Sequence, residues 1–224
     1  MPTAPPATDV AADSVPADRP RRRIGRLLLG LLAGAVVLCV LAGVAVAALA
    51  VRVDGASMRP TLADGQRLLT VPGSGGAEVR RLDVVLLKRP GRDEVIVKRV
   101  IGLPGDRVRI SSTPQEPFEV LLQPAGSGAW YRVELPAWTA QAHRTGGCCT
   151  PDGTRTAAPT TQTVPPGRVF FLGDNPDGSE DSRSFGWGDL ATVSGRIGLR
   201  VWPPAEIGRP GAAPTLSEVP APQD

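Results

Sequence analysis

The feature that most constrains the fold is an uncharged, strongly apolar run of 25 residues, Leu27–Val51. As an α-helix it would extend about 37 Å at ~1.5 Å per residue, which is enough to cross the ~30 Å hydrocarbon core of a bilayer with some tilt. Five arginines lie within the eight positions before the run, whereas only three follow it between residues 52 and 71. The positive-inside rule therefore predicts a cytoplasmic N-terminus and an extracytoplasmic segment from residue 52 onward.

An alternative for the same run is a cleaved secretory signal. Ala48-Leu49-Ala50 supplies the small-x-small pattern of a cleavage site, so cleavage of the Ala50–Val51 bond stays open. The run is nevertheless longer than the apolar region of a signal peptide, which is typically about 7–15 residues. We therefore predict a retained transmembrane helix over residues 27–51.

The segments at both ends of the chain have little to bury. Residues 1–26 are rich in Ala, Pro and Asp and then in Arg, which predicts a disordered cytoplasmic tail that ends in an arginine cluster. Residues 208–224 are rich in Pro and Ala and predict a flexible C-terminal tail. Residues 52–207 are left as one extracytoplasmic domain.

This domain reads as mainly β. Short β-branched runs bounded by Gly, Pro and Asp alternate without a convincing helical period, which favours an antiparallel coiled sheet or a barrel-like arrangement. Residues 111–166 are richer in Ser, Thr, Pro and Gly, and we expect an insertion or small subdomain there. The eight predicted strands are Leu68–Val71, Asp83–Lys88, Glu94–Ile101, Arg107–Ile110, Phe118–Leu122, Trp130–Leu135, Arg168–Leu172 and Ile197–Trp202.

Composition argues against several classes of site. The net charge is only +3 and no basic patch is interleaved with aromatic residues, so nucleic-acid binding has little support. The single histidine, His143, lies in a Gly/Thr/Pro-rich segment, which disfavours a Ser-His-Asp triad. Cys148 and Cys149 are adjacent, a poor spacing for tetrahedral zinc ligation, so we predict no metal site.

The cysteines leave their redox state open. Cys148 and Cys149 would lie in an oxidising compartment, where a vicinal disulfide, an intermolecular disulfide and free thiols are all compatible with the sequence. Cys39 falls inside the apolar run and is expected to be an inert, small apolar residue.

A candidate nucleophile, Ser57, stands shortly after the apolar run, in the loop-like stretch Asp54-Gly55-Ala56-Ser57-Met58-Arg59-Pro60-Thr61-Leu62. A serine hydroxyl attacks well only when a base takes its proton. Lys98 is the candidate base, because apolar residues flank it in Val95–Ile101 and burial lowers the pKa of a lysine. Taken singly, the serine fits an ordinary loop residue and the lysine fits an edge-strand residue that reaches water. The hypothesis depends on their combination.

Three stretches together resemble bacterial type I signal peptidases, the membrane-anchored Ser-Lys endopeptidases. The pattern Gly55-x-Ser57-Met58-x-Pro60-Thr61-Leu62 resembles the nucleophile motif of that family, and Lys98–Asp106 resembles its lysine motif. Gly173-Asp174-Asn175 followed by Ser179-x-Asp181-Ser182-Arg183-x-Phe185-Gly186 resembles the third motif. The order of the motifs and the N-terminal anchor agree, whereas the tails and residues 111–166 are not matched closely.

The resemblance implies roles at matching positions. Ser57 would be the nucleophile and its backbone N–H an oxyanion donor, and Lys98 would be the general base. Ser179 would hydrogen-bond the lysine amine, and Asp181 and Arg183 would form a supporting ion pair. Gly55 stands where some relatives have a hydroxyl side chain that assists the oxyanion hole, and it matches the variant of Gram-positive members. No cofactor is implied.

The resemblance also implies substrates and a location. The substrates would be secretory precursors with Ala-x-Ala cleavage sites, cut by a single-pass protein of the cell membrane, in possible association with the secretion machinery. Residues of the specificity pockets cannot be assigned from the sequence; Met58 and Leu62 fit a pocket, contact with lipid or simple packing.

Three other functions compete with this one. A Ser-Lys peptidase dedicated to a pilin, conjugation or spore protein would carry the same motifs. A soluble repressor-type autoprotease shares a Ser-Lys dyad and a β fold, but the apolar run argues against it. A non-catalytic membrane-anchored β module would not need both Ser57 and Lys98.

Overall fold

A computed structural model describes residues 19–112, 117–136, 138, 148, 150–154, 156, 158–211 and 214–222. The chain divides into two compact units, Met1–Ala48 and Leu49–Asp224, which are described separately. The first contains the long helix α1, and the second contains two β-sheets.

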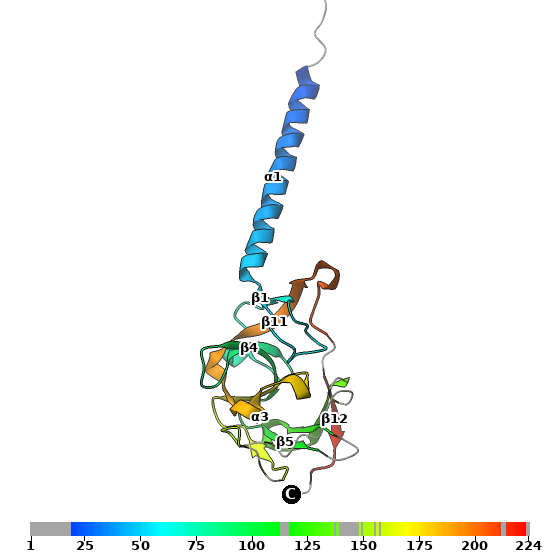
Figure 1. The fold of residues 1–224 in the computed structure, drawn as a ribbon. Helices are drawn as coiled ribbons and strands as arrows, with labels where there is room; N and C mark the ends of the chain where they lie inside the picture. Colours follow the sequence, from blue (N-terminus) through cyan, green and yellow to red (C-terminus); the bar gives the residue numbers. More distant parts are fainter. Residues whose placement is uncertain are drawn as a thin grey trace, which may run out of the picture. The chain divides into compact units, whose positions relative to one another are not determined.

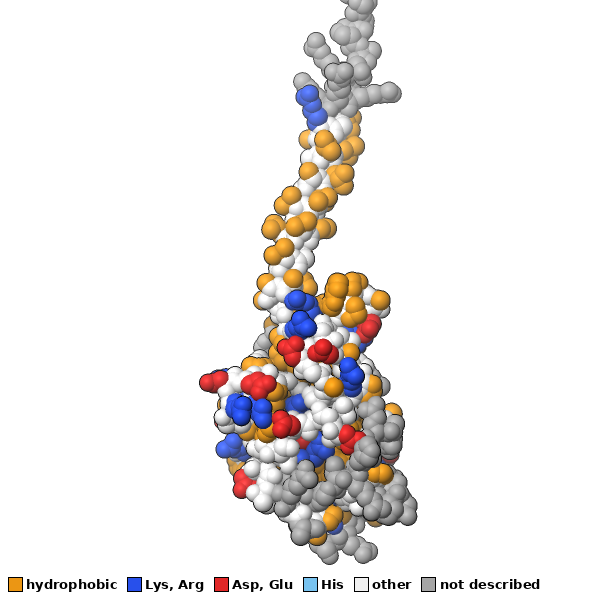
Figure 2. Space-filling view, in the orientation of Figure 1, with side chains coloured by type: hydrophobic (Ala, Val, Ile, Leu, Met, Phe, Trp, Pro, Cys, Tyr) orange, Lys and Arg blue, Asp and Glu red, His pale blue; other side chains and the backbone are white. Residues whose placement is uncertain are grey.

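Helix α1 runs from Arg19 to Leu49, and its segment Ile24–Leu49 is long and apolar enough to cross a membrane. Large apolar side chains are exposed on every side of it, since consecutive residues such as Leu27, Leu28 and Leu29 are all exposed. Orange atoms cover much of the face of the helix that Figure 2 shows. An all-round apolar surface is what lipid requires and what water disfavours. The helix begins at Arg19, so the prediction of a disordered segment is wrong for residues 19–26; arginine is a good helix former. Residues 1–18 lie outside the described residues.

The first sheet of the second unit holds seven strands in the order β1-β2-β11-β3-β4-β9-β10, and every neighbouring pair is antiparallel. Strand β11 is the longest and pairs with both β2 and β3, so it joins the two halves of the sheet. The strands are β1 (Val51–Arg52), β2 (Arg67–Thr70), β3 (Val84–Lys88), β4 (Val95–Gly102), β9 (Arg168–Leu172), β10 (Gly188–Asp189) and β11 (Val193–Trp202).

The second sheet has the order β12-β7-β6-β5-β8. Figure 1 shows its strands β5 and β12 on one side of the short helix α3, and β4 and β11 of the first sheet on the other. Its strands are β5 (Arg107–Ser111), β6 (Glu119–Gln123), β7 (Trp130–Glu134), β8 (Gln162–Thr163) and β12 (Thr215–Val219). The remaining short elements are α3 (Ser182–Phe185) and the 3₁₀ turns η1 (Gly76–Glu78), η2 (Pro124–Gly126), η3 (Pro176–Gly178), η4 (Leu190–Thr192) and η5 (Pro204–Glu206).

Two expectations about the second sheet need revision. Strands β6, β7 and β8 fall within the predicted insertion, but they share their sheet with β5 and β12, so this sheet is not built from residues 111–166 alone. The expectation of a flexible C-terminal tail is wrong for Thr215–Val219, because β12 pairs with β7 over five residues. The β-branched residues Thr215 and Val219 are compatible with a strand, whereas the surrounding prolines hid it in the sequence.

The core follows the alternation of strand side chains. On β3, Val84 and Leu86 belong to one apolar cluster with Leu62 and Leu68, while Val85 and Leu87 belong to another with Val100 and Phe171. Both faces of β3 are therefore buried, as expected for a central strand. A third cluster, which includes Val108, Leu122 and Phe170, packs the second sheet against the first.

The predicted fold class is confirmed. Each of the eight predicted strands overlaps an observed strand, all pairings are antiparallel, and the apolar helix precedes them. In the part of the chain that the structure describes, neither sheet closes on itself, so the arrangement is two open sheets and not a closed barrel.

The structure describes two of the three cysteines, Cys39 and Cys148. Cys148 is disulfide-bonded, which removes the free-thiol alternative for that residue, and Cys39 is a free cysteine. Cys149 and His143 lie outside the described residues.

Asp106 is a fully buried carboxylate that links the two sheets. Its oxygens accept two hydrogen bonds from the Arg81 guanidinium, at 2.7 and 2.6 Å, and further ones from the backbone N–H groups of Leu103 and Ala125. The bond from Leu103 closes the turn between β4 and β5. The carboxylate raises the pKa of Arg81, chiefly through the hydrogen bond.

We expect Asp106→Ala to lower the free energy of unfolding by about 2–3 kcal/mol, because it leaves two N–H groups and a partly buried guanidinium without their acceptor. Urea titration of the detergent-solubilised protein, followed by tryptophan fluorescence, measures this. The control is Asp93→Ala, which removes a fully exposed carboxylate and should change stability by less than about 0.5 kcal/mol. Equal losses in the two variants would contradict the assignment.

Candidate active site

The Ser57 loop is anchored by its apolar neighbours. Met58 and Leu62 are almost completely buried, at 1% and 0% exposure, in the cluster with Val53 and Leu86. The N–H of Leu62 donates to the carbonyl of Met58, so the chain makes a tight turn directly after the serine. Of the roles considered for Met58 and Leu62, packing is the observed one, and Met58 also reaches the wall of a cleft. These contacts fix the backbone that follows Ser57.

Lys98 lies on β4 and its amine meets Ser57. The Nζ atom of Lys98 is 2.7 Å from the Oγ atom of Ser57, which is within hydrogen-bond distance. Strand alternation puts Ile96 and Val100 on one side of β4 and Val97 on the other, and these residues contribute to different apolar clusters. Only 4% of Lys98 is exposed, so the predicted burial of this residue is confirmed.

Burial lowers the pKa of Lys98 from its ordinary value of 10.5, because the ammonium ion loses its hydration. The carboxylate of Asp181 opposes this effect and the guanidinium of Arg183 adds to it. The direction is the one that a general base requires, since only the neutral amine can accept a proton. Lys88, the only other lysine in the sequence, is exposed and pairs with Asp93.

The third stretch is bonded directly to the nucleophile loop. The backbone N–H of Asn175 donates to the carbonyl of Ser57 at 3.0 Å, and its side-chain Nδ2 donates to the carbonyl of Ala56 at 3.1 Å. Asn175 also accepts from the N–H of Gly178, which holds the following 3₁₀ turn. The backbone on both sides of the serine side chain is thereby fixed from a segment more than 100 residues away.

Asp181 and Arg183 form the predicted ion pair. The guanidinium Nε and Nη2 atoms donate to the two carboxylate oxygens of Asp181, each at 2.8 Å, and both residues are buried. Asp181 also accepts from the N–H of Gly173 at 3.0 Å, and Arg183 donates to the carbonyl of Pro176. The pair thus shapes the loop that supports Ser57 and does not touch the serine itself.

Ser179 is placed differently from the prediction. Its hydroxyl oxygen is buried and has no hydrogen-bond partner among the described residues, so the predicted bond to the Lys98 amine is not formed. The hydroxyl instead packs against Gly173, where a Cβ atom would collide with Ser179 Oγ and would lie 2.5 Å from the carbonyl oxygen of Ser57. The segments that carry Ser57, Gly173 and Ser179 pack closely here, and Ser179 contacts Gly173 and not the Lys98 amine.

A second ion pair lies behind β4. Arg99 follows Lys98 in the strand and points to the opposite side, where its Nε and Nη2 atoms meet the carboxylate of Asp174 at 2.7 and 2.6 Å. Its Nη1 atom donates to the carbonyl of Leu82. Both side chains are buried and paired with each other, which is a structural role.

Ser57 and Lys98 open into a cleft of about 510 Å³. The segment from Val51 to Met58 forms one part of its wall, and Val95–Lys98 of β4 forms another. On the side of β9, strand β4 is paired only from Arg99 onward, so within the described residues the edge of Val95–Lys98 is free. The N–H of Ser57 also has no acceptor among the described residues, so it is available to a ligand in the cleft.

Comparison with known proteins decides the family. Residues 26–202 match the family model described as "Signal peptidase, peptidase S26". The chain belongs to the signal peptidase family. It is 34% identical over 157 residues to a signal peptidase I of Bacillus caldolyticus, covering 67% of this chain and 78% of that one. It is 30% identical over 169 residues to a signal peptidase IB of Staphylococcus aureus, covering 69% of this chain and 78% of that one.

A solved signal peptidase I from Enterococcus faecalis is also similar, with 25% identity, a TM-score of 0.37, and coverage of 53% of this chain and 95% of that chain. Membership of the family makes the chain a peptidase that removes signal peptides, and its substrates are secreted precursor proteins. The family and the long apolar helix together indicate attachment to a membrane.

Sequence reasoning missed two residues that position the site, Asn175 and Gly173. Both stood in the third stretch, but nothing in the sequence showed that an amide there would reach the carbonyl of Ala56. The signal that could have found Gly173 was its place between a strand of apolar residues and a polar turn, where glycine marks close approach of backbones.

We expect Gly173→Ala to reduce kcat/KM on a secreted precursor by at least about 100-fold, because a displacement of ~1 Å in a catalytic group costs that much. The added methyl group must push aside either Ser179 or the carbonyl of Ser57. Gly30→Ala is the control, since a Cβ at Gly30 meets nothing within 4 Å. Unchanged activity in Gly173→Ala would show that the close packing is not needed.

Proposed function

We propose that this signal peptidase works through a Ser-Lys dyad of Ser57 and Lys98. The observation that carries the proposal is the 2.7 Å separation of Lys98 Nζ and Ser57 Oγ in an apolar setting. A lysine in this setting keeps a larger neutral fraction near pH 7 than an exposed lysine does, and it can take the serine proton. Lys88, the only other lysine in the sequence, is exposed and pairs with Asp93, so it does not have this setting.

The reaction proceeds in two steps. Ser57 Oγ attacks the carbonyl carbon of the scissile peptide bond while its proton passes to Lys98 Nζ. The C–N bond then breaks, the leaving amine takes the proton from Lys98, and the acyl group stays on Ser57 as an ester. Lys98, again neutral, removes a proton from a water molecule, whose oxygen attacks the ester carbonyl. The bond from this carbon to Ser57 Oγ then breaks, Lys98 gives the proton to Oγ, and the carboxylic acid product is released. The backbone N–H of Ser57 would donate to the oxyanion in both steps.

The supporting residues act through position. Asp181 and Arg183 hold the loop that carries Gly173 and Asn175, and these residues hold the backbone of Ser57. We assign Ser179 to the same supporting group through its packing against Gly173. Asp181, Arg183 and Ser179 neither donate nor accept a proton in the proposed cycle.

The free edge of β4 suggests how the precursor binds. An extended peptide can add to Val95–Lys98 as a further strand, with main-chain hydrogen bonds giving affinity and pockets for alternate side chains giving specificity. We propose Ala-x-Ala sites as substrates, with small residues at positions −1 and −3 before the cut. Association with the secretion machinery would deliver such precursors.

The proposed topology is single-pass in the cell membrane. The arginines that precede the apolar segment favour a cytoplasmic N-terminus, which places the β unit outside the cytoplasm. Ser57 follows the end of α1 by only eight residues, so the chain itself limits its distance from the bilayer. The peptidase dedicated to a pilin, conjugation or spore protein shares all these features and differs only in its substrates.

Replacement of either dyad member should abolish cleavage. With a precursor carrying an Ala-x-Ala site, we expect the detergent-solubilised wild type to cut after the second alanine. Ser57→Ala, Lys98→Ala and Lys98→Arg should each lose at least about a thousandfold in kcat/KM. Lys98→Arg keeps a positive charge but cannot supply a base at neutral pH. Lys88→Ala is the matched control and should retain activity, whereas cleavage that persists in Lys98→Ala would remove the dyad.

Activity should rise with pH through the pKa of Lys98. The neutral amine is the active form, so kcat/KM is low below that pKa and levels off above it. Because burial lowers this pKa below 10.5, the rise should lie at lower pH than the titration of an exposed lysine such as Lys88. A pH profile of kcat/KM measures it, and a profile that stays flat from acid pH upward would contradict a lysine base.

A further inference from the structure

A cluster of four residues lies at the end of the β3–β4 hairpin: Arg89, Glu94, Glu180 and Phe185, here called the Arg89 cluster. The guanidinium of Arg89 donates to Glu94 at 3.2 Å and to Glu180 at 3.4 Å. Its Cζ atom lies 4.1 Å from the centre of the Phe185 ring, which is a cation–π distance. Arg89 is held between two carboxylates and a ring, and only 20% of its side chain is exposed.

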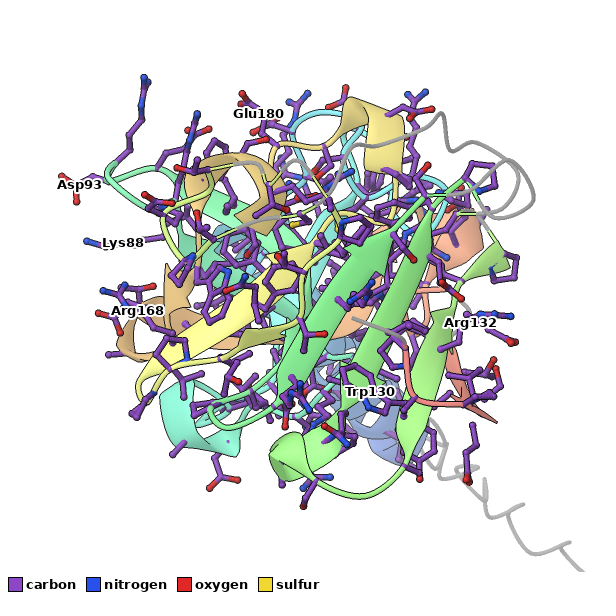
Figure 3. The ribbon with its side chains drawn as sticks, turned by 90° about the horizontal axis from the view of Figure 1, so that it is seen from below. Lys88, Asp93, Trp130, Arg132, Arg168 and Glu180 are labelled. Carbon is purple, nitrogen blue, oxygen red and sulfur yellow. The ribbon has the colours of Figure 1, made fainter. Side chains whose placement is uncertain are left out.

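The cluster joins the hairpin to the loop that supports the dyad. Arg89 and Glu94 close the turn between β3 and β4, since the N–H of Arg89 donates to the carbonyl of Glu94. Glu180 stands between Ser179 and Asp181, and Phe185 ends α3. All four line the same cleft as Ser57 and Lys98. Figure 3 shows Glu180 on its loop, and Lys88 and Asp93 side by side at the hairpin, where neither lines the cleft.

The described lining of this cleft carries a surplus negative charge. When Lys98 is neutral, two basic residues, Arg52 and Arg89, face three acidic ones, Asp54, Glu94 and Glu180. Arg52 and Asp54 pair with each other at 3.2 Å. The single charge of Arg89 is therefore shared by two carboxylates, whose side chains are 56% and 68% exposed and open to a ligand.

The position of the cluster defines which part of a substrate it meets. This step rests on the proposed function, in which the residues before the scissile bond lie along the free edge of β4. Val95 is three residues from Lys98, or about 10 Å at ~3.3 Å per residue. A peptide that has position −1 at Lys98 therefore has position −4 opposite Val95, next to Glu94, and position −5 just beyond it.

We propose that the Arg89 cluster is a specificity-determining subsite that favours a basic side chain four or five residues before the scissile bond and disfavours an acidic one. A lysine or arginine there neutralises the carboxylate that Arg89 leaves uncompensated. An acidic side chain adds a like charge beside Glu94 and Glu180. The effect is moderate because both carboxylates are exposed to solvent.

The test compares two precursor peptides that differ only at position −4, one with Lys and one with Glu. For the wild type we expect the Lys peptide to have a kcat/KM about two- to fivefold higher at low salt, the range of a solvent-exposed charge pair. The ratio should fall toward one in Glu180→Gln, and in wild type at about 1 M NaCl, where the Debye length is ~3 Å. Asp93→Asn, which removes an exposed carboxylate of the same hairpin outside the cleft, should keep the wild-type ratio.

Binding of the same peptides to Ser57→Ala, measured by fluorescence anisotropy, makes the result independent of turnover. The subsite is supported if the Lys peptide binds with the lower Kd and loses this advantage on Glu180→Gln. If the wild type binds the peptides in this way but cleaves neither, only the proposed function is overturned. A second pair of peptides carries the Lys or Glu at position −5 instead. Equal cleavage and equal binding within both pairs would mean that the Arg89 cluster only holds the hairpin to its neighbouring loop, and this result would overturn the proposal.

Discussion

The site depends on one amine being kept out of water. Lys98 stands on a central strand of a sheet whose two faces are packed, and its amine finds the Ser57 hydroxyl at 2.7 Å in place of solvent. An uncompensated buried ammonium ion is costly, so the fold itself favours the neutral form that chemistry needs. The carboxylate of Asp181 opposes this, but it is already bonded to Arg183 and to Gly173. Pairing of the surrounding charges is therefore a condition for the lowered pKa of Lys98.

The buried ion pairs share this logic. Asp106 with Arg81, Asp174 with Arg99 and Asp181 with Arg183 are each bidentate, and each carboxylate is fully buried. Each pair also fixes backbone: a turn after β4, the carbonyl of Leu82, and the N–H of Gly173. Breaking such a pair costs more than its net contribution to stability, because the remaining charge stays in a dry environment. They hold three chain segments in register around a lysine and a serine that lie 41 positions apart.

The sequence predicted the strands well, and it predicted that Ser57 and Lys98 lie together, for physical reasons. The β-branched run Val95–Ile101 favours a strand, and the apolar residues that flank Lys98 favoured its burial over an exposed edge position. What it could not predict depended on long-range contacts. β12 was hidden among prolines because its pairing with β7 lies some 80 residues away, and Ser179 was expected to meet Lys98 but packs against Gly173. Local pattern carries no information about which of several nearby polar groups a hydroxyl will face.

The strand order has a consequence for the time at which the enzyme becomes active. In the first sheet, β11 lies between β2 and β3, and β9 flanks β4, although β11 and β9 follow these strands by more than 60 residues in the chain. Asn175 and Gly173, which hold the backbone around Ser57, are also late in the chain. Because synthesis proceeds from the N-terminus, a nascent molecule carries its serine and lysine early but lacks the framework that aligns them. The contacts that align Ser57 and Lys98 are therefore completed last, so their arrangement requires nearly the whole β unit.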